Sequence, residues 1–256
     1  MNRLDPELIR KYFKKRPGAG MSIFLIVIGG IAILGAFSLR HTEIIQISLL
    51  VGSILILIGL IRLIKRLGSR LSDDDIDNQF QDDLKEIARN ALNKLGLDET
   101  QLTENRKEPL MLKGPILWTT TGVNKKDLLW RKGKDDIVRF AIYRVTIIYF
   151  SKHLLASFAC DFNFIKNVTL NEATDEYYYK DIVSVSTSET STSYVLPNGV
   201  KLTRSQEFRL SLSNGEAIKV FIDSGKLNQV TKGNIPTEEA EKAVQIIRTI
   251  LRDKKQ

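Results

Sequence analysis

The sequence has few of the residues that build catalytic and metal sites. It contains one cysteine, Cys160, and two histidines, His41 and His153. One thiol cannot form an intrachain disulfide bond, which fits a reducing compartment. These residues are not spaced as a zinc site or a Cys-His catalytic pair. The sequence also lacks a phosphate-binding P-loop and a Gly-x-Ser-x-Gly turn. We therefore expect a protein that is not an enzyme, with no catalytic residues, no metal and no cofactor.

The three consecutive carboxylates Asp73 to Asp75 are the residues that most resemble a cation-binding site. Neighbouring residues on a helix point in different directions, so we interpret them as the first turn of a helix. Ser72 is a suitable cap, and the helix dipole favours anions at this position. The apolar spacing continues to Leu95 and stops at Gly96. We predict a juxtamembrane linking helix within residues 65–96.

Charge is missing from two long apolar runs, residues 21–39 and 44–64, which a polar break separates. A bilayer core is about 30 Å thick and a helix rises about 1.5 Å per residue, so each run is long enough to cross it. Two buried helices of a soluble protein are the alternative. A cleaved signal peptide fits less well, because its apolar core is shorter and ends at a small-residue cleavage site. We predict a two-helix transmembrane hairpin over residues 21–64.

The middle of each run lacks ionisable side chains. Gln46, near one end, is the only strongly polar side chain there, which argues against ion or proton transport. Small residues instead share one face of each run. Lipid supplies no hydrophobic force between helices, so close backbone contact must hold them together. These faces either pack the hairpin or assemble copies into a homo-oligomer, and their residues are Gly29, Ala32, Ala36, Ser48, Gly52 and Gly59.

The N-terminal arm, residues 1–20, is rich in lysine and arginine. Asp5 followed by Pro6 predicts the start of a helix, with Asp5 as its cap. One interpretation is an amphipathic helix at the membrane surface, and the other is a solvated basic tail; the pattern leaves both open. In the first interpretation the side chains that face lipid are Leu4, Leu8, Tyr12 and Phe13.

Basic residues flank the hairpin on both sides and contribute to a formal net charge of +8. By the positive-inside rule, both chain termini lie in the cytoplasm and the protein is a multi-pass protein of the cell (inner) membrane. The expected partners are the lipid bilayer and its anionic headgroups. The residues predicted to lie at this interface are Arg10, Lys11, Lys14, Lys15, Arg16, Lys65, Arg66 and Arg70.

The two tryptophans, Trp118 and Trp130, have basic neighbours. Aromatic rings beside lysine and arginine can contact lipid headgroups or nucleic acid phosphates. A pair of core tryptophans with solvated lysines nearby is the alternative that we prefer. The strand count and register of residues 97–136 stay open. The candidate ligand or lipid contacts are Lys125, Lys126, Trp130, Arg131 and Lys132.

From Ile137 onward, apolar residues alternate with a period of two, which is typical of strands. Predicted strands cover residues 138–150 and 154–164, and residues 177–185 are expected to form either a strand pair or one long strand. Asn214-Gly215 is typical of a tight hairpin turn. A second such turn is expected at Asn198-Gly199.

An amphipathic helix is predicted over residues 237–253. Strands followed by one helix predict a membrane-anchored α+β protein. Its domain, residues 97–256, is a mostly antiparallel curved sheet or partly open barrel that the helix closes.

The run of residues 177–186, the Asn-Gly turns and the terminal helix resemble bacterial pleckstrin-homology-like (PH-like) domains found beside transmembrane hairpins. The resemblance covers roughly the second half of the chain. It implies a seven-stranded curved sheet closed by a helix, with a binding role and no transferable catalytic residues. The Ser/Thr-rich residues 184–193 depart from a compact hairpin, so the register of residues 184–200 stays open.

Two functions follow from these features. The first is a membrane-anchored, non-enzymatic binding or sensing protein whose cytoplasmic domain recognises a protein, a lipid headgroup or a small signalling ligand. The alternative is a membrane-disrupting effector of the defence type, in which the domain triggers oligomerisation of the hairpin. Nucleic-acid binding is the third hypothesis, and it predicts that binding depends steeply on salt concentration.

Overall fold

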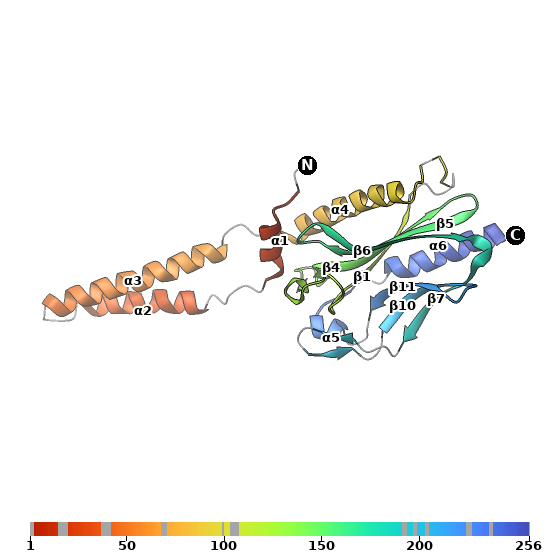
Figure 1. Ribbon diagram of the computed structural model, residues 1–256. Coiled ribbons are helices and arrows are strands. Elements are labelled where there is room, and N and C mark those ends of the chain that lie inside the picture. Colours follow the sequence, from red (N-terminus) through yellow and green to blue (C-terminus); the bar gives the residue numbers. More distant parts are fainter. Residues whose placement is uncertain are drawn as a thin grey trace. The chain divides into compact units, whose positions relative to one another are not determined.

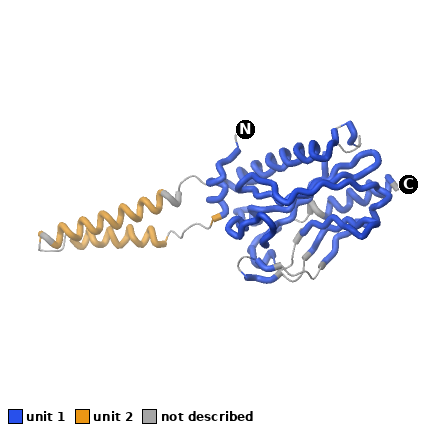
Figure 2. The backbone as a smooth tube through the Cα atoms, viewed as in Figure 1, with its two compact units in different colours: residues 1–13, 71–256 blue, residues 14–70 orange. Residues whose placement is uncertain are grey.

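The structure is a computed structural model of the chain, and it describes residues 3–14, 20–36, 42–67, 71–98, 100–102, 108–190, 194–196, 199–202, 205–223, 227–235 and 238–255. The chain forms two compact units (Figure 2). Unit 1 comprises residues 1–13 and 71–256, and unit 2 comprises residues 14–70. Unit 2 is therefore inserted into the sequence of unit 1.

Unit 2 consists of α2 (Gly20–Ala36) and α3 (Thr42–Leu67), which pack along one another in antiparallel directions. Glycines allow this approach. A Cβ atom built on Gly29 would lie 2.7 Å from the carbonyl oxygen of Gly52, and one built on Gly52 would lie 2.8 Å from the carbonyl oxygen of Gly29. The two backbones are thus in direct contact, and any larger side chain would force them apart.

The outward faces of α2 and α3 carry large apolar side chains that the protein leaves uncovered. Residues Ile44–Ile64 of α3 are long and apolar enough to cross a membrane, whereas α2 is a shorter apolar helix. In the alternative of two buried helices of a soluble protein, these faces would be covered by other parts of the protein. The most exposed of these side chains are Met21, Phe24, Ile31, Leu34, Ile47, Leu50, Leu57 and Ile64.

Unit 1 contains two main antiparallel sheets (Figure 1). The four-stranded sheet has the order β1-β4-β5-β6 and is formed by β1 (Leu110–Pro115), β4 (Ile142–Phe150), β5 (Leu154–Asn163) and β6 (Val168–Tyr178). The three-stranded sheet has the order β11-β10-β7 and is formed by β7 (Ile182–Thr190), β10 (Ser205–Leu212) and β11 (Ala217–Asp223). Short pairs are formed by β2 (Trp130–Lys132) with β3 (Val138–Phe140), and by β8 (Tyr194–Val195) with β9 (Lys201–Leu202).

Both faces of the four-stranded sheet are covered. Along β4, Val145 and Ile147 join a core cluster with α4 (Asp73–Lys94), while Ile148 and Phe150 join another with the three-stranded sheet and α6 (Glu238–Lys255). Figure 1 shows α4 and α6 on opposite sides of these strands. Burial on both faces explains why residues 147–150 at the end of β4 are large and mainly apolar without alternation.

The fold agrees with the expected α+β class, and the helix predicted over residues 237–253 is found as α6. The hairpin at Asn214-Gly215 is confirmed, because β10 pairs with β11 and Gly215 has a φ of 88°. Among the described strands, the two main sheets do not join into a closed barrel. Of the two alternatives for residues 177–185, the structure shows two strands, because the 3-10 turn η2 (Tyr179–Asp181) separates β6 from β7.

The prediction of a linking helix over residues 65–96 needs correction. Residues 65–67 belong to α3, and α4 is a core helix of unit 1. Its apolar face, which includes Ile76, Leu84 and Ile87, is buried against the four-stranded sheet. The sequence correctly indicates an amphipathic helix, but the sheet that covers it is formed by residues far along the chain.

Candidate functional site

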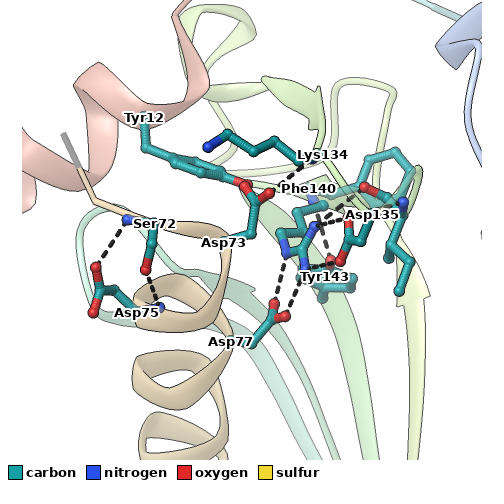
Figure 3. A network of polar contacts seen from close by, with 11 residues as sticks. Tyr12, Ser72, Asp73, Asp75, Asp77, Lys134, Asp135, Phe140 and Tyr143 are labelled. Carbon is teal, nitrogen blue, oxygen red and sulfur yellow. Dashed lines mark hydrogen bonds and ion pairs between the residues drawn. The ribbon is translucent and has the colours of Figure 1, made fainter.

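The candidate site lies where the segments before and after unit 2 meet within unit 1. We call it the junction and define it by Tyr12, Asp73, Asp77, Asp135 and Arg139 (Figure 3). It joins α1 (Pro6–Phe13), the first turns of α4 and the β2–β3 hairpin. Unit 2 begins two residues after Tyr12, at Lys14, and ends three residues before Asp73, at Arg70. The junction therefore joins the two parts of unit 1 between which unit 2 is inserted in the sequence.

Helix α1 begins as predicted. The carboxylate of Asp5 accepts a hydrogen bond of 2.8 Å from the backbone N–H of Glu7, and Pro6 takes the first helical position, where no N–H is needed. Its apolar face is buried: Ile9 and Tyr12 are fully buried and Phe13 nearly so. This apolar face packs in the same core cluster as α4.

Neither the interfacial helix nor the solvated tail describes α1. The apolar face that was expected to meet lipid meets the core of unit 1, since amphipathicity indicates that a face is covered but does not reveal what covers it. Arg10, predicted at the membrane interface, instead pairs at 3.1 Å with Asp127. That carboxylate is fully buried and also pairs with Lys166 at 2.5 Å.

Tyr12 ties the segment before unit 2 to the segment after it. Its hydroxyl donates to Oδ1 of Asp73 at 2.7 Å, and the backbone N–H of Lys134 donates to Oδ2 of the same carboxylate at 2.8 Å. Arg131 donates to the carbonyl of Tyr12 at 2.8 Å, and its guanidinium carbon lies 4.3 Å from the centre of the tyrosine ring. One carboxylate thus joins α1, α4 and the β2–β3 turn.

Burial and the bond to Asp73 raise the pKa of the Tyr12 hydroxyl, so it stays a donor at neutral pH. For Asp73, burial favours the protonated form. The hydrogen bonds from Lys134 and Tyr12 outweigh this effect and hold the pKa of the carboxyl below its usual value. The ionised carboxylate is therefore the form that this arrangement stabilises.

Arg139 forms the second part of the junction. Its guanidinium donates to both oxygens of Asp77, at 2.7 and 2.6 Å, and to both oxygens of Asp135, at 3.0 and 2.7 Å. The side chain is 6% exposed, so the charge is withdrawn from water and must be paired. Hydrogen bonds from Arg139 lower the pKa of Asp135 to about 2. This residue fastens β3 to α4 and has no donor left for a ligand.

The capping interpretation of Asp73 to Asp75 is confirmed. Ser72 accepts from the N–H of Asp75 at 3.0 Å, and the Asp75 carboxylate accepts from the N–H of Ser72 at 2.8 Å. This reciprocal pair is a capping box. The carboxylates of Asp73 and Asp75 serve different partners, as expected for consecutive helix residues.

The predicted ligand contacts are dispersed by the fold. Trp130 and Trp118 both pack against a hydrophobic cluster that includes Leu117 and Phe221. Arg131 is bound to α1, and Lys132 pairs with Asp136 at 2.6 Å. Of the predicted contacts, those that remain exposed without such a structural bond are Lys125 and Lys126, in the short helix η1 (Lys125–Asp127).

The remaining interface residues have mixed placements. Lys11 and Lys14 are exposed at the end of α1. Lys15, Arg16 and Arg70 lie outside the described residues. Lys65 and Arg66 belong to the helical backbone of α3, and their side chains are also outside the described set.

The predicted helix-packing residues all belong to α2 and α3, and those with a described neighbour face the other helix. Besides Gly29 and Gly52, a Cβ atom built on Gly59 would lie 2.6 Å from Ile26. The hydroxyl of Ser48 donates to the carbonyl of Ala32 at 2.9 Å, and Ala36 is fully buried. These small residues are used within one chain.

Unit 1 offers little reactive chemistry in its described part. Burial raises the pKa of Cys160 to about 12, so its thiol stays protonated at neutral pH. His153 lies exposed in the β4–β5 turn. A cavity of about 250 Å³ lies between α4 and strands β5 and β6, and the Lys94–Glu172 ion pair forms part of its lining.

Sequence reasoning missed the junction. Arg139 carried a usable signal, because a charged residue stands between Val138 and Phe140 in an apolar strand, which indicates a buried and paired charge. Its partners could not be identified, since Asp77 is 62 positions away. No protein-family model, no curated protein and no solved structure matches the chain.

Proposed function

We propose that this protein is a membrane-anchored, non-enzymatic binding or sensing protein. Unit 2 is its anchor, and unit 1 is its cytoplasmic binding domain. The observation that carries the proposal is the outward surface of unit 2, which consists of large apolar side chains exposed on both helices. An apolar surface of this extent is stable in a bilayer and unfavourable in water.

The length of α3 supports a transmembrane helix, and α2 is at the lower limit for a second one. The 26 residues of α3 extend about 39 Å, more than the bilayer core of about 30 Å, whereas the 17 residues of α2 extend about 26 Å. Antiparallel packing brings the start of α2 and the end of α3 to the same side of the bilayer. By the positive-inside rule, the basic residues that flank the hairpin support a cytoplasmic location for this side and for both termini.

The order of elements in unit 1 supports a PH-like domain. The two main sheets contain four and three strands, and α6 follows the last strand and packs against the core between them. The resemblance to PH-like domains implies that unit 1 has a binding role. The closed junction and the inert Cys160 give no argument for catalysis.

The arrangement of unit 2 favours an anchor over a membrane-disrupting effector. An effector must present helix faces that recruit other copies. Gly29, Gly52 and Gly59 instead face the partner helix of the same chain, where they have no room for a further helix.

Membrane extraction tests the anchor. The full chain is expected to stay with membranes in alkaline carbonate. A variant with Ile31→Arg, Leu50→Arg and Leu57→Arg should be extracted, because arginine near the bilayer centre costs about 2.5–3.5 kcal/mol per residue. The matched control is Val168→Arg, Val183→Arg and Val195→Arg, which places the same charges at exposed apolar positions of unit 1. Extraction of the wild-type chain would overturn the proposal.

Dye release separates the anchor from the effector. Vesicles that contain the full chain should retain an encapsulated dye as well as empty vesicles do. Release that depends on the wild-type chain, and that Gly52→Leu abolishes, would instead support the effector.

A further inference from the structure

Exposed lysines surround the junction on three elements of unit 1. We call them the basic rim: Lys11 on α1, Lys125 and Lys126 on η1, and Lys134 in the β2–β3 turn. All four are exposed.

Hydrogen bonds and ion pairs fix these elements beside one another. The Arg10–Asp127 ion pair joins α1 to η1, and the bond from Arg131 to the Tyr12 carbonyl joins β2 to α1. Figure 3 shows the Lys134 side chain extending toward Tyr12 and α1. These bonds hold the three elements that carry the rim lysines beside one another.

Most carboxylates near the rim form ion pairs or hydrogen bonds with residues of unit 1 other than the rim lysines. Asp127 pairs with Arg10 and Lys166, and Asp136 pairs with Lys132. At the junction, Asp73, Asp77 and Asp135 are bound as described above. By contrast, within the described part of the chain no carboxylate forms an ion pair with a rim lysine; the exposed acidic neighbours are Asp74 and, one turn before Lys11 on α1, Glu7. The four rim lysines outnumber these two carboxylates, so positive charge prevails around the junction.

The residues of unit 1 that flank unit 2 are Phe13 and Leu71, and they lie one and two residues along the chain from the junction residues Tyr12 and Asp73. Residues 68–70 alone separate the end of α3 from Leu71, and residues 14–19 separate Phe13 from α2. An extended chain advances at most about 3.6 Å per residue, so the shorter connection reaches about 14 Å. When unit 2 spans a bilayer, the rim is thus tethered to the headgroups of the leaflet from which the chain emerges.

We propose that the basic rim binds the anionic headgroups of this leaflet and holds unit 1 in one orientation against the membrane. The inference rests on the membrane anchor proposed above and names the partner of the domain. A lysine near an anionic surface contributes about fivefold to binding. The combined effect of four lysines is large even when their contributions are not fully additive.

Lysine modification in nanodiscs tests the proposal. The full chain is placed in discs of phosphatidylcholine alone or with 30% phosphatidylglycerol, and the rate of acetylation is measured at each lysine by mass spectrometry. The rim lysines should react at least threefold more slowly in the anionic discs, and 0.5 M salt should remove this protection. Lys152, in the turn at the opposite end of β4 and β5, should react equally in both discs.

A charge-matched pair of variants tests cooperation within the rim. In Lys125→Gln, Lys126→Gln and Lys134→Gln together, the protection of Lys11 should be lost. In Lys152→Gln, Lys201→Gln and Lys219→Gln, which carry the same change of charge at exposed positions elsewhere, the protection of Lys11 should persist.

Three results would overturn the proposal: equal rates in neutral and anionic discs, equal protection by soluble glycerophosphate in neutral discs, or protection only when an acidic peptide is added. Failure of the anchor itself is distinguishable, because the chain would then not enter either kind of disc.

Discussion

The helices of unit 2 touch through glycine, whereas the elements of unit 1 are held by large apolar side chains and by paired charges. In unit 2, the described side-chain hydrogen bond between the helices is the one from Ser48 to Ala32. In unit 1, Arg139 and Asp127 are buried charges with partners on other elements. Lipid gives helices no hydrophobic reason to associate, so close contact decides their packing. In water, apolar burial drives folding, and paired charges fix how the elements meet.

Breaking the charge pairs of unit 1 should have the largest effect. In Asp77→Asn with Asp135→Asn, Arg139 keeps its buried position but loses both carboxylates, so unfolding should become easier by about 3 kcal/mol. Both tryptophans lie in unit 1, so their fluorescence during urea unfolding of the full chain reports on this unit alone.

The control breaks two exposed pairs, with Asp82→Asn and Asp136→Asn, and should cost less than about 1 kcal/mol. Equal effects of the two double variants would mean that the buried charge does not organise unit 1.

Overpacking the glycine contact should be the next largest effect, and it should be confined to unit 2. Gly52→Leu places atoms where the Gly29 carbonyl and Ile33 lie, with a cost of about 1–3 kcal/mol. The measurement uses a chain with Ala32→Cys, Ser48→Cys and Cys160→Ala in vesicles. The yield of the disulfide bond between positions 32 and 48 should be lower when Gly52→Leu is added.

The matched control is Gly30→Leu, because a Cβ atom built on Gly30 meets nothing within 4 Å. Undiminished disulfide formation in Gly52→Leu would show that the glycine contact does not hold the helices together.

Removing the hydroxyl of Tyr12 should have a smaller effect, because the ring stays in the core. Tyr12→Phe loses the bond to Asp73 and should destabilise unit 1 by about 1 kcal/mol. Hydrogen exchange should become faster in residues 6–13 than in the strands. Tyr178→Phe, at an exposed position, should leave both measurements unchanged. Unchanged exchange in α1 of Tyr12→Phe would mean that apolar packing alone fixes this helix.

Acid should weaken unit 1 gradually. The pKa of Asp135 is about 2 in the folded protein, below its ordinary value of 3.8, so its contribution is present above about pH 4 and is lost as the pH falls toward 2. Burial raises the pKa of Asp83, which opposes this slope. Tryptophan-monitored urea unfolding between pH 5 and 3 should show a shallower loss of stability in Asp135→Asn than in the wild type. An identical slope would contradict the assignment.

Local patterns were sufficient for much of the fold. The Ser72 cap, the Asn214-Gly215 turn, the start of α1 and the helix near the C-terminus each depend on residues that are close in sequence. The apolar stretch of α3 and the small residues that contact across unit 2 are likewise visible as spacing along the chain.

What covers each surface was decided by the tertiary structure. The apolar face of α1 has the same pattern whether lipid or protein covers it, and only the fold places it against α4. Arg10 and Arg131 lie among basic residues of the kind found at membrane interfaces. Their partners in the fold, Asp127 and Tyr12, lie more than 100 positions away in the sequence. A sequence pattern indicates that a side chain must be buried or paired, because its polarity and its neighbours in the sequence are visible along the chain. The identity of its partner depends on long-range contacts, which the sequence does not display.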